Sequence, residues 1–318
     1  MNLAEVISHW DIGTLTDSRA AQHGSLNDVN IIATSHGRFA LKTYRSSYSQ
    51  QQLSAQHEIL LYLSAHQQPI PTPIHLPDGS SWLEVDGRFH VFFPFASGVQ
   101  LERGQWTEVE AGAAGQTLAQ LHSRLAAYGG VLRDKTFEID LKLTLRRLAM
   151  LTEHINQKPE LDATDRNALA HLEQRRVWLQ QHHASLEQRL SDLPFQAIHS
   201  DYHDGNLFFA GNIVSAVIDW ESVARFPRSW ELLRAMHYTL HLEPKLTAAW
   251  LNAYQQFNPI SDTELEASVL FYTLERAHVL WPFQAYYLQG NERAGKFIDS
   301  GDFVPFNDLW THVATYLS

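Results

Sequence analysis

Residues 198–209 of the chain read IHSDYHDGNLFF, and residues 213–221 read IVSAVIDWE after a Gly-Asn turn. In both segments short apolar runs flank polar residues, which predicts a strand, a loop, a second strand, a tight turn and a third strand. The ends of these strands carry three oxygen-bearing side chains, Asp201, Asn206 and Asp219. Such oxygen donors suit Mg²⁺ better than Zn²⁺, so the stretch predicts a magnesium site held by rigid backbone.

The spacing of these residues is similar to that of a known catalytic loop. The order H-x-D-x-x-x-x-N, followed by two apolar residues and Asp, resembles the catalytic loop and metal-binding Asp of the protein-kinase-like superfamily. The residues themselves, HSDYHDGNLFF and VIDWE, most resemble the small-molecule branch of this superfamily, the aminoglycoside phosphotransferase and choline kinase family. The resemblance implies that Asp201 orients the acceptor hydroxyl or accepts its proton, while Asn206 and Asp219 hold the metal ions. It also implies ATP and Mg²⁺ as cofactors and a structural, hydrogen-bonding role for His199.

Other interpretations of the same loop stay open. Asp, Asn and Gly are common turn formers, so the plainest alternative is that Asp201 and Asn206 only shape a turn and have no catalytic or metal-binding role. A second alternative is a metal-dependent hydrolase that uses the cluster of His199, Asp201, His203 and Asp204, although this leaves Asn206 unexplained. A third is a catalytically inactive kinase fold that binds a nucleotide or a partner.

Length and composition restrict the class of protein. A chain of 318 residues with 44% hydrophobic and 19% charged residues is typical of an ordinary globular protein, and is long enough for two packed lobes. Its formal net charge of −11 argues against general binding of nucleic acid or of an anionic membrane. The absence of cysteine excludes disulfides and thiolate metal sites. Because residues 1–10 carry no evident secretion signal and no apolar run is long enough to cross a bilayer, we expect a cytoplasmic protein with no membrane partner.

Residues 1–97 predict a nucleotide-binding lobe made of a small antiparallel sheet and one helix. Residues 38–45 alternate as a strand does, and Lys42 among them resembles the A-x-K lysine that touches the nucleotide phosphates in the kinase-like fold. The polar turn ahead of this strand contains Gly24 and Ser25, and the resemblance implies that it covers those phosphates. The turn has one glycine where protein kinases carry three, so which backbone amides reach the phosphates stays open.

A helix and a hairpin complete this lobe. Apolar residues at helical spacing over 49–66 predict a helix with Glu58 at its middle. An acidic residue on an adjacent helix would aim the Lys42 ammonium at the phosphates, so we predict a Lys42–Glu58 ion pair, with a solvated Glu58 as the alternative. An Asp-Gly pair between two alternating runs predicts a hairpin, after which Pro94 and Phe95 would face the adenine.

Residues 98–318 predict a larger, mostly helical lobe that carries the catalytic and acceptor-binding residues, so the expected fold class is α+β. Periodic apolar residues predict helices over 106–127, 140–157, 163–190, 230–241, 246–257, 261–288 and 306–317. His122 is expected to be a packed, hydrogen-bonded residue of the first helix. The chain after Asp219 has no A-P-E motif, the docking platform for a protein substrate, which favours a small acceptor molecule. Glu221 is expected near the metals or the acceptor.

The resemblance therefore implies an ATP- and Mg²⁺-dependent phosphotransferase that acts on a hydroxyl of a small molecule. Chain length, the Gly-Ser turn ahead of Lys42 and the helical tail are similar to bacterial homoserine kinases of the aminoglycoside phosphotransferase type. Amino alcohols, sugars and aminoglycosides also remain open as acceptors. Arg276 and His278 are the residues that we expect to contact the acceptor. Neither the choice between ATP and GTP nor the oligomeric state follows from the sequence.

Overall fold

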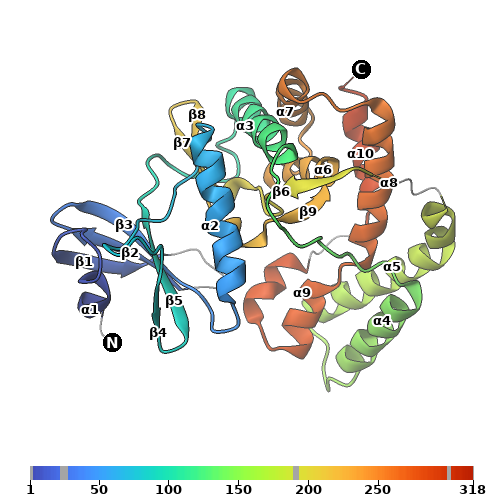
Figure 1. The fold of residues 1–318 in the computed structure, drawn as a ribbon. Coiled ribbons are helices and arrows are strands. Elements are labelled where there is room, and N and C mark those ends of the chain that lie inside the picture. Colours follow the sequence, from blue (N-terminus) through green and yellow to red (C-terminus); the bar gives the residue numbers. More distant parts are fainter. Residues whose placement is uncertain (1–2, 22–27, 189–192, 299–301, 318) are drawn as a thin grey trace.

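A computed structural model describes residues 3–21, 28–188, 193–298 and 302–317, and Figure 1 shows how its elements are arranged. A small antiparallel sheet with one long helix lies beside a larger, mostly helical part. This is the predicted α+β fold. Gly24 and Ser25, predicted to cover the nucleotide phosphates, lie outside the described residues.

The N-terminal sheet has five strands in the order β1-β2-β3-β5-β4, all pairing antiparallel. A short helix, α1 (Leu3–Ile7), precedes its strands, which are β1 (Leu15–Ala20), β2 (Asp28–Thr34), β3 (Gly37–Thr43), β4 (Leu83–Val85) and β5 (Arg88–Pro94). The predicted hairpin between β4 and β5 is confirmed. Its turn residues Asp86 and Gly87 have φ values of 51° and 71°, the positive angles that a two-residue Asp-Gly hairpin turn requires. The edge strand β1 was not predicted.

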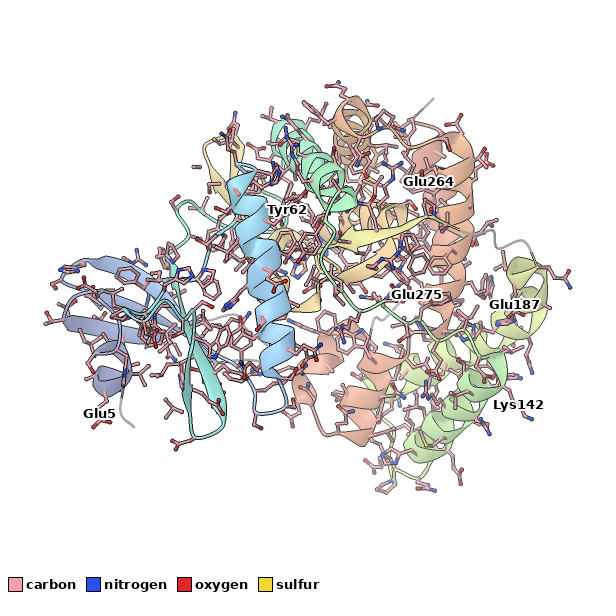
Figure 2. The ribbon with its side chains drawn as sticks, viewed as in Figure 1. Glu5, Tyr62, Lys142, Glu187, Glu264 and Glu275 are labelled. Atoms are coloured by element: carbon pink, nitrogen blue, oxygen red, sulfur yellow. The ribbon has the colours of Figure 1, made fainter. Side chains whose placement is uncertain are left out.

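The long helix α2 (Gln50–Ala65) lies between the sheet and the helical part of the molecule (Figure 1). Ser49 caps its N-terminus in a capping box with Gln52, which satisfies backbone amides that the first turn leaves without partners. Its side chain Tyr62 donates a hydrogen bond of 2.9 Å to the carbonyl of Arg124 on the neighbouring helix α3 (Glu108–Ala126), and Figure 2 labels Tyr62 on α2.

Helices surround the C-terminal core on several sides. The predicted helices end within a few residues of their expected bounds, except for one. In addition to α3, they are α4 (Leu141–Asn156), α5 (Ala163–Glu187), α6 (Arg228–Leu240), α7 (Pro244–Phe257), α8 (Asp262–His278) and α10 (Phe306–Ala314). The closest helix pair is α3 against α7, where a Cβ at Gly115 would collide with the backbone of Trp250. The absence of a side chain at Gly115 therefore allows the backbones of α3 and α7 to approach closely.

The helix predicted over 261–288 is wrong as a single element. Helix α8 ends at His278, and after a break the chain forms α9 (Trp281–Phe283) and a π-helical turn, η3 (Gln284–Leu288). Pro282 explains the break, because its ring cannot continue a regular helix from the preceding turn. A further turn, η4 (Glu292–Phe297), follows. Val279 and Trp281, at the break, line a cavity between α6 and α8 that is described below.

Two short antiparallel strand pairs lie in the C-terminal part. Strand β7 (Leu207–Ala210) forms a hairpin with β8 (Ile213–Val217), and β6 (Phe195–Ile198), which precedes them, pairs with β9 (Ala224–Pro227), which follows them. The three strands predicted for residues 198–221 are therefore present, whereas β9 was missed. The amide of Ile218, just after β8, donates to the carbonyl of Asn206, which joins the β6–β7 loop to the end of β8. Among the residues described, no helix has the length and apolar character needed to cross a membrane.

Candidate active site

The predicted oxygen-bearing residues lie together at the ends of β6, β7 and β8. The side chain of Asn206 donates through Nδ2 to the backbone carbonyl of Asp201 at 2.8 Å. The carbonyl of Asn206 in turn accepts from the amide of Ile218, the residue before Asp219, at 3.0 Å. Ser200 and Asp219 both adopt positive φ angles, 71° and 64°, in a region that non-glycine residues seldom enter. Two strained positions thus bracket the site, as is common where function fixes the backbone.

His199 fixes the shape of this loop and is not available to a metal. Its Nδ1 accepts from the amide of Asp201 at 3.1 Å, so Nε2 carries the hydrogen that it donates to the carbonyl of Ile218 at 2.9 Å. Burial lowers the pKa of His199, which favours this neutral form. The structural role expected for His199 agrees with these contacts.

The interpretation as a hydrolase metal cluster is wrong. Both ring nitrogens of His199 are engaged, and the described part of the chain contains no group of three or more His, Cys, Asp or Glu side chains that could hold a metal ion. A magnesium site makes a different demand, because Mg²⁺ usually takes only one or two protein carboxylates and completes its shell with waters and phosphate oxygens. The donor set of Asn206 and Asp219 fits that pattern, since the side-chain hydrogen bonds of Asn206 use Nδ2 and leave Oδ1 for a cation.

Asp201 is held as a carboxylate by two neighbours. Arg234 Nη2 on α6 donates to Asp201 Oδ1 at 2.8 Å, and His203 Nε2 lies 3.6 Å from Oδ2. Burial alone would raise the pKa of Asp201, but the His203 hydrogen bond and the Arg234 charge outweigh it and hold that pKa well below its usual range. The same contact acts in the other direction on His203. Burial would lower the pKa of His203, but the carboxylates of Asp201 and Asp204 raise it to about 9.

This charge state decides what Asp201 can do. A general base works best when its pKa lies near the working pH, and a carboxylate held at so low a pKa is a weak proton acceptor. It is, however, a strong hydrogen-bond acceptor. Asp201 is therefore suited to orient a hydroxyl in line for attack, one of the two roles that the resemblance implies for it.

Lys42 reaches this site from the N-terminal sheet. Its Nζ lies 2.9 Å from Asp219 Oδ1 and also forms an ion pair with Glu221. Burial would lower the pKa of Lys42, but the charges of Asp219 and Glu221 outweigh it and raise that pKa. The structure thus brings Lys42 to Asp219, one of the two predicted metal ligands, across the boundary between the sheet and the helical part. Glu221 shares Lys42 with Asp219, and its place near a metal stays a prediction.

The predicted ion pair between Lys42 and Glu58 is wrong. Glu58 is exposed on α2, whereas the preceding residues Gln56 and His57 are buried. The apolar residues Leu53 and Leu60 mark the inward face of the helix, and a residue one position after His57 is rotated by about 100° away from it. The helical period alone could therefore have excluded Glu58. The acidic partner comes from the turn after β8 instead.

The proposed adenine contacts lie at the end of β5. Pro94 is exposed and pairs in register with Phe39 of β3. The amide of Phe95 donates to the carbonyl of Arg38 at 3.3 Å, and the Arg38 guanidinium lies 3.9 Å from the centre of the Phe95 ring. Whether these two residues contact a nucleotide stays a prediction.

A buried polar network holds the backbone of the loop that carries Asp201. Glu231 on α6 is 1% exposed, and its Oε2 accepts from the amide of His199 at 3.0 Å and lies 2.9 Å from His122 Nε2. The other ring nitrogen of His122 is 2.8 Å from the hydroxyl of Tyr254. Burial would raise the pKa of Glu231, but the hydrogen bonds with the His122 ring and the His199 amide lower it. The expectation of a packed, hydrogen-bonded His122 is confirmed.

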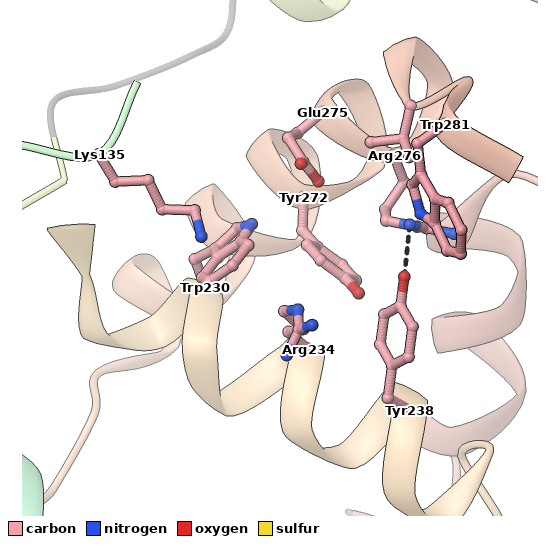
Figure 3. A pocket seen from close by; sticks show the side chains of 9 residues that line it. Lys135, Trp230, Arg234, Tyr238, Tyr272, Glu275, Arg276 and Trp281 are labelled. Carbon is pink, nitrogen blue, oxygen red and sulfur yellow. Dashed lines mark hydrogen bonds between the residues drawn. The ribbon is translucent and has the colours of Figure 1, made fainter. Parts of the chain in front are cut away.

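A cavity of about 170 Å³ lies between α6 and α8, and Figure 3 shows its lining, which includes Arg234, the residue that binds Asp201. Its walls are Lys135, Trp230, Arg234, Tyr238, Tyr272, Glu275, Arg276, Val279 and Trp281. Arg276 lines it, consistent with the expected acceptor contact. His278 does not line it, because its ring is buried against α4 with Nδ1 2.6 Å from the Thr144 hydroxyl. Contact of His278 with the acceptor stays a prediction, and its packing against α4 gives no support for it.

Two lining residues, Arg234 and Lys135, were not expected at the site. The spacing of Arg234 carried a usable signal, because it follows Glu231 by three residues and so lies on the same face of α6. Lys135 carried none, since it belongs to an irregular segment whose amide donates to the carbonyl of Arg225 on β9. Only the three-dimensional fold brings it to the cavity.

Comparisons with known proteins agree with this geometry. The profile of the phosphotransferase enzyme family matches residues 17–266. Homoserine kinase of Brucella canis is 26% identical over 272 residues, which cover 84% of this chain and 78% of that protein. Spectinomycin phosphotransferase, solved with ADP and spectinomycin, superimposes with a TM-score of 0.70 at 17% identity and covers 99% of this chain and 98% of its own. A microcompartment-associated aminopropanol kinase gives 0.65 at 15% identity, with 99% and 97% covered.

The family profile extends over most of the chain, and the structural likeness extends over nearly all of it. The fold is thus the two-lobed protein-kinase-like fold that the sequence predicted. The chain belongs to the phosphotransferase enzyme family, and it is a small-molecule kinase that phosphorylates a hydroxyl group.

Proposed function

We propose that this kinase transfers the γ-phosphoryl group of ATP to a hydroxyl of a small metabolite in a Mg²⁺-dependent reaction. Residues 1–97 form the nucleotide-binding lobe in this proposal, and residues 98–318 carry the catalytic and acceptor-binding groups. The observation that supports it best is the convergence of Lys42 with Asp219 and of Asp219 with the Asp201 loop, from three separate segments of the chain.

The roles of the residues follow from their contacts. The acceptor hydroxyl donates a hydrogen bond to the Asp201 carboxylate, which orients the hydroxyl oxygen. Arg234 keeps Asp201 ionised. Asn206 Oδ1 and Asp219 would hold the divalent ion, whose charge neutralises the triphosphate. Lys42 would pair with phosphate oxygens, and the amides and carbonyls near Pro94 and Phe95 would contact the base.

Replacing Asp201 with Asn tests the proposal. The change removes the charge but keeps the size of the side chain, and loss of the group that orients the acceptor hydroxyl should lower turnover by about 10²-fold. ADP release is measured over a panel of amino alcohols, hydroxy acids, sugars, nucleosides and aminoglycosides, with binding of a fluorescent ATP analogue as the second readout. Asp78→Asn, on an exposed turn, is the matched control and should match the parent.

Two results would refute the catalytic role. Full turnover of the Asp201→Asn enzyme would remove Asp201 from the chemistry. Binding of the ATP analogue without turnover of any acceptor by the parent enzyme would favour the inactive kinase fold instead.

A further inference from the structure

The cavity beside Asp201 is cationic in an acidic protein. Lys135, Arg234 and Arg276 line it together with one carboxylate, Glu275. Figure 3 shows Lys135 on one side, Arg276 on the other and Arg234 between them at the base. The formal charge of the lining is therefore three minus one, or +2, whereas that of the whole chain is −11.

A further cation lies behind the wall. Arg175 on α5 is 6% exposed, and its guanidinium donates to the carbonyl of Val279, a wall residue, and contacts His171 at 3.0 Å. These partners bring no negative charge, and the nearness of Arg276 helps to lower the pKa of Arg175 to about 9, although burial is the larger cause. Counting this residue and Asp201, four cations face two carboxylates, so the charge of the region stays at +2.

Arg234 connects the cavity to the reacting groups. Its Nη2 binds Asp201, while its Nη1 is buried and has no hydrogen-bond partner among the residues described. A buried guanidinium donor without a partner is costly, and a ligand that supplies an acceptor removes that cost. A molecule in the cavity thus lies one guanidinium group away from the carboxylate that orients the acceptor hydroxyl.

The aromatic walls leave little attraction for a cationic ligand. The Lys135 ammonium lies 4.6 Å from the centre of the Trp230 ring, and the guanidinium of Arg234 lies 4.7 Å from that of Tyr238. Trp230 and Tyr238, two of the four aromatic rings of the lining, are therefore already in contact with the protein's own cations. The volume of about 170 Å³ also lies below the roughly 300 Å³ at which pockets for drug-sized ligands begin.

We propose that the acceptor is a small hydroxylated carboxylic acid, whose carboxylate binds between Lys135 and Arg276 while its hydroxyl reaches Asp201. This inference depends on the proposed phosphotransferase function and narrows it. It disfavours aminoglycosides, because a polycation would meet Lys135, Arg234 and Arg276 at close range. It also separates the two reactions named among the relatives, since homoserine carries a carboxylate and aminopropanol does not.

Matched acceptors test the carboxylate directly. L-Homoserine is compared with its methyl ester and with 3-amino-1-propanol, glycerate with glycerol, and 4-hydroxybutyrate with its methyl ester, and kcat/KM is measured by ADP release. For the acceptor that reacts, we expect the carboxylate form to exceed its neutral or cationic counterpart by about 10- to 100-fold, the effect of one charged hydrogen bond. Better turnover of the esters, the alcohols or an aminoglycoside would overturn the inference and leave the kinase function intact. No turnover of any acceptor would instead count against the proposed function.

Variants locate the effect in the cavity. Lys135→Gln and Arg276→Met should each raise KM for the carboxylated acceptor by about 10-fold or more and leave KM for ATP unchanged. The loss of preference for the carboxylate over its ester is the readout that a general loss of structure would not produce. Lys135 is half-buried at the edge of the cavity, so Lys135→Gln stays informative if Arg276→Met does not fold. Lys142→Gln on α4, labelled in Figure 2, is the control and should keep the parent's preference for the carboxylate over its ester. If Lys135→Gln and Arg276→Met keep the same preference as this control, the assignment is overturned.

Discussion

The carboxylate of Glu231 is predicted to hold the catalytic loop in place, and its removal should be costly. One oxygen, Oε2, interacts with the His199 amide at 3.0 Å and with His122 at 2.9 Å, in a site that is 1% exposed. Hydrogen bonds to a charged group contribute about 1.5–3 kcal/mol each, so two of them amount to roughly 3–6 kcal/mol. Breaking a buried pair by removing one partner typically costs about 3–5 kcal/mol. We therefore expect Glu231→Ala to lower the free energy of unfolding by about 3–5 kcal/mol.

Glu231→Gln should be milder because its amide oxygen can replace Oε2. Its NH₂ group then occupies the position of Oε1, which is buried and has no hydrogen-bond partner in the described structure, at a cost of about 1–3 kcal/mol. Chemical denaturation gives the free energies. At about 2 °C per kcal/mol for a chain of this size, calorimetry should show Tm lowered by roughly 6–10 °C for the alanine variant.

Kinetics separate this role from simple stability. Since the His199 amide lies two residues before Asp201, loss of its anchor should lower kcat and leave KM for ATP unchanged, even well below Tm. Glu173→Gln, which breaks an exposed pair with Arg176, is the control and should change stability by less than about 1 kcal/mol. The reasoning is refuted if Glu231→Ala unfolds like the parent, or if it is destabilised and yet retains full kcat.

Two further predictions concern other parts of the chain. Ser200→Gly should raise the free energy of unfolding by about 0.5–1 kcal/mol, because it relieves a left-handed residue at φ 71° and deletes a buried hydroxyl without a partner; an equal or lower free energy in urea denaturation would contradict this. Burial lowers the pKa of His278 to about 4, so this ring stays neutral in the folded state at pH 5 to 7. In the unfolded chain the ring binds a proton below its usual pKa of 6.5, and this lowers the free energy of unfolding as the pH falls. Stability should therefore fall between pH 7 and pH 5, and His278→Gln should reduce this loss by about 2 kcal/mol, measured by denaturation at both pH values. Equal losses in both proteins would disprove the assignment.

Local patterns predicted most of the elements and the clustering of Asp201, Asn206 and Asp219 at strand ends. The Asp-Gly turn and the apolar periods of α2 and α3 are properties of neighbouring residues, so a sequence reveals them. The order of residues from Asp201 to Asp219 carries the same kind of local information, because the one short hairpin between them, β7–β8, brings them together.

Pairings between distant segments were not predictable in this way. Edge strand β1 has only one of its residues half-buried and the others exposed, so it lacks the alternation that marks a strand. Strand β9 is short and ends on Pro227, which gave it the appearance of a loop. The partners of Lys42 depend on how β3 packs against the turn after β8. The cations around the cavity depend on how α6, α8 and the segment around Lys135 pack against one another, and no local pattern encodes either arrangement.

The two carboxylates on Lys42 have a consequence for how the enzyme is loaded. One ammonium group faces two carboxylates, Asp219 and Glu221, so the three groups together carry a formal charge of −1. A divalent ion held by Asp219 would supply the positive charge that Lys42 alone does not, and Lys42 could then pair with phosphate oxygens. A nucleotide without its cation would instead meet this excess negative charge. We therefore expect the nucleotide to bind together with its cation.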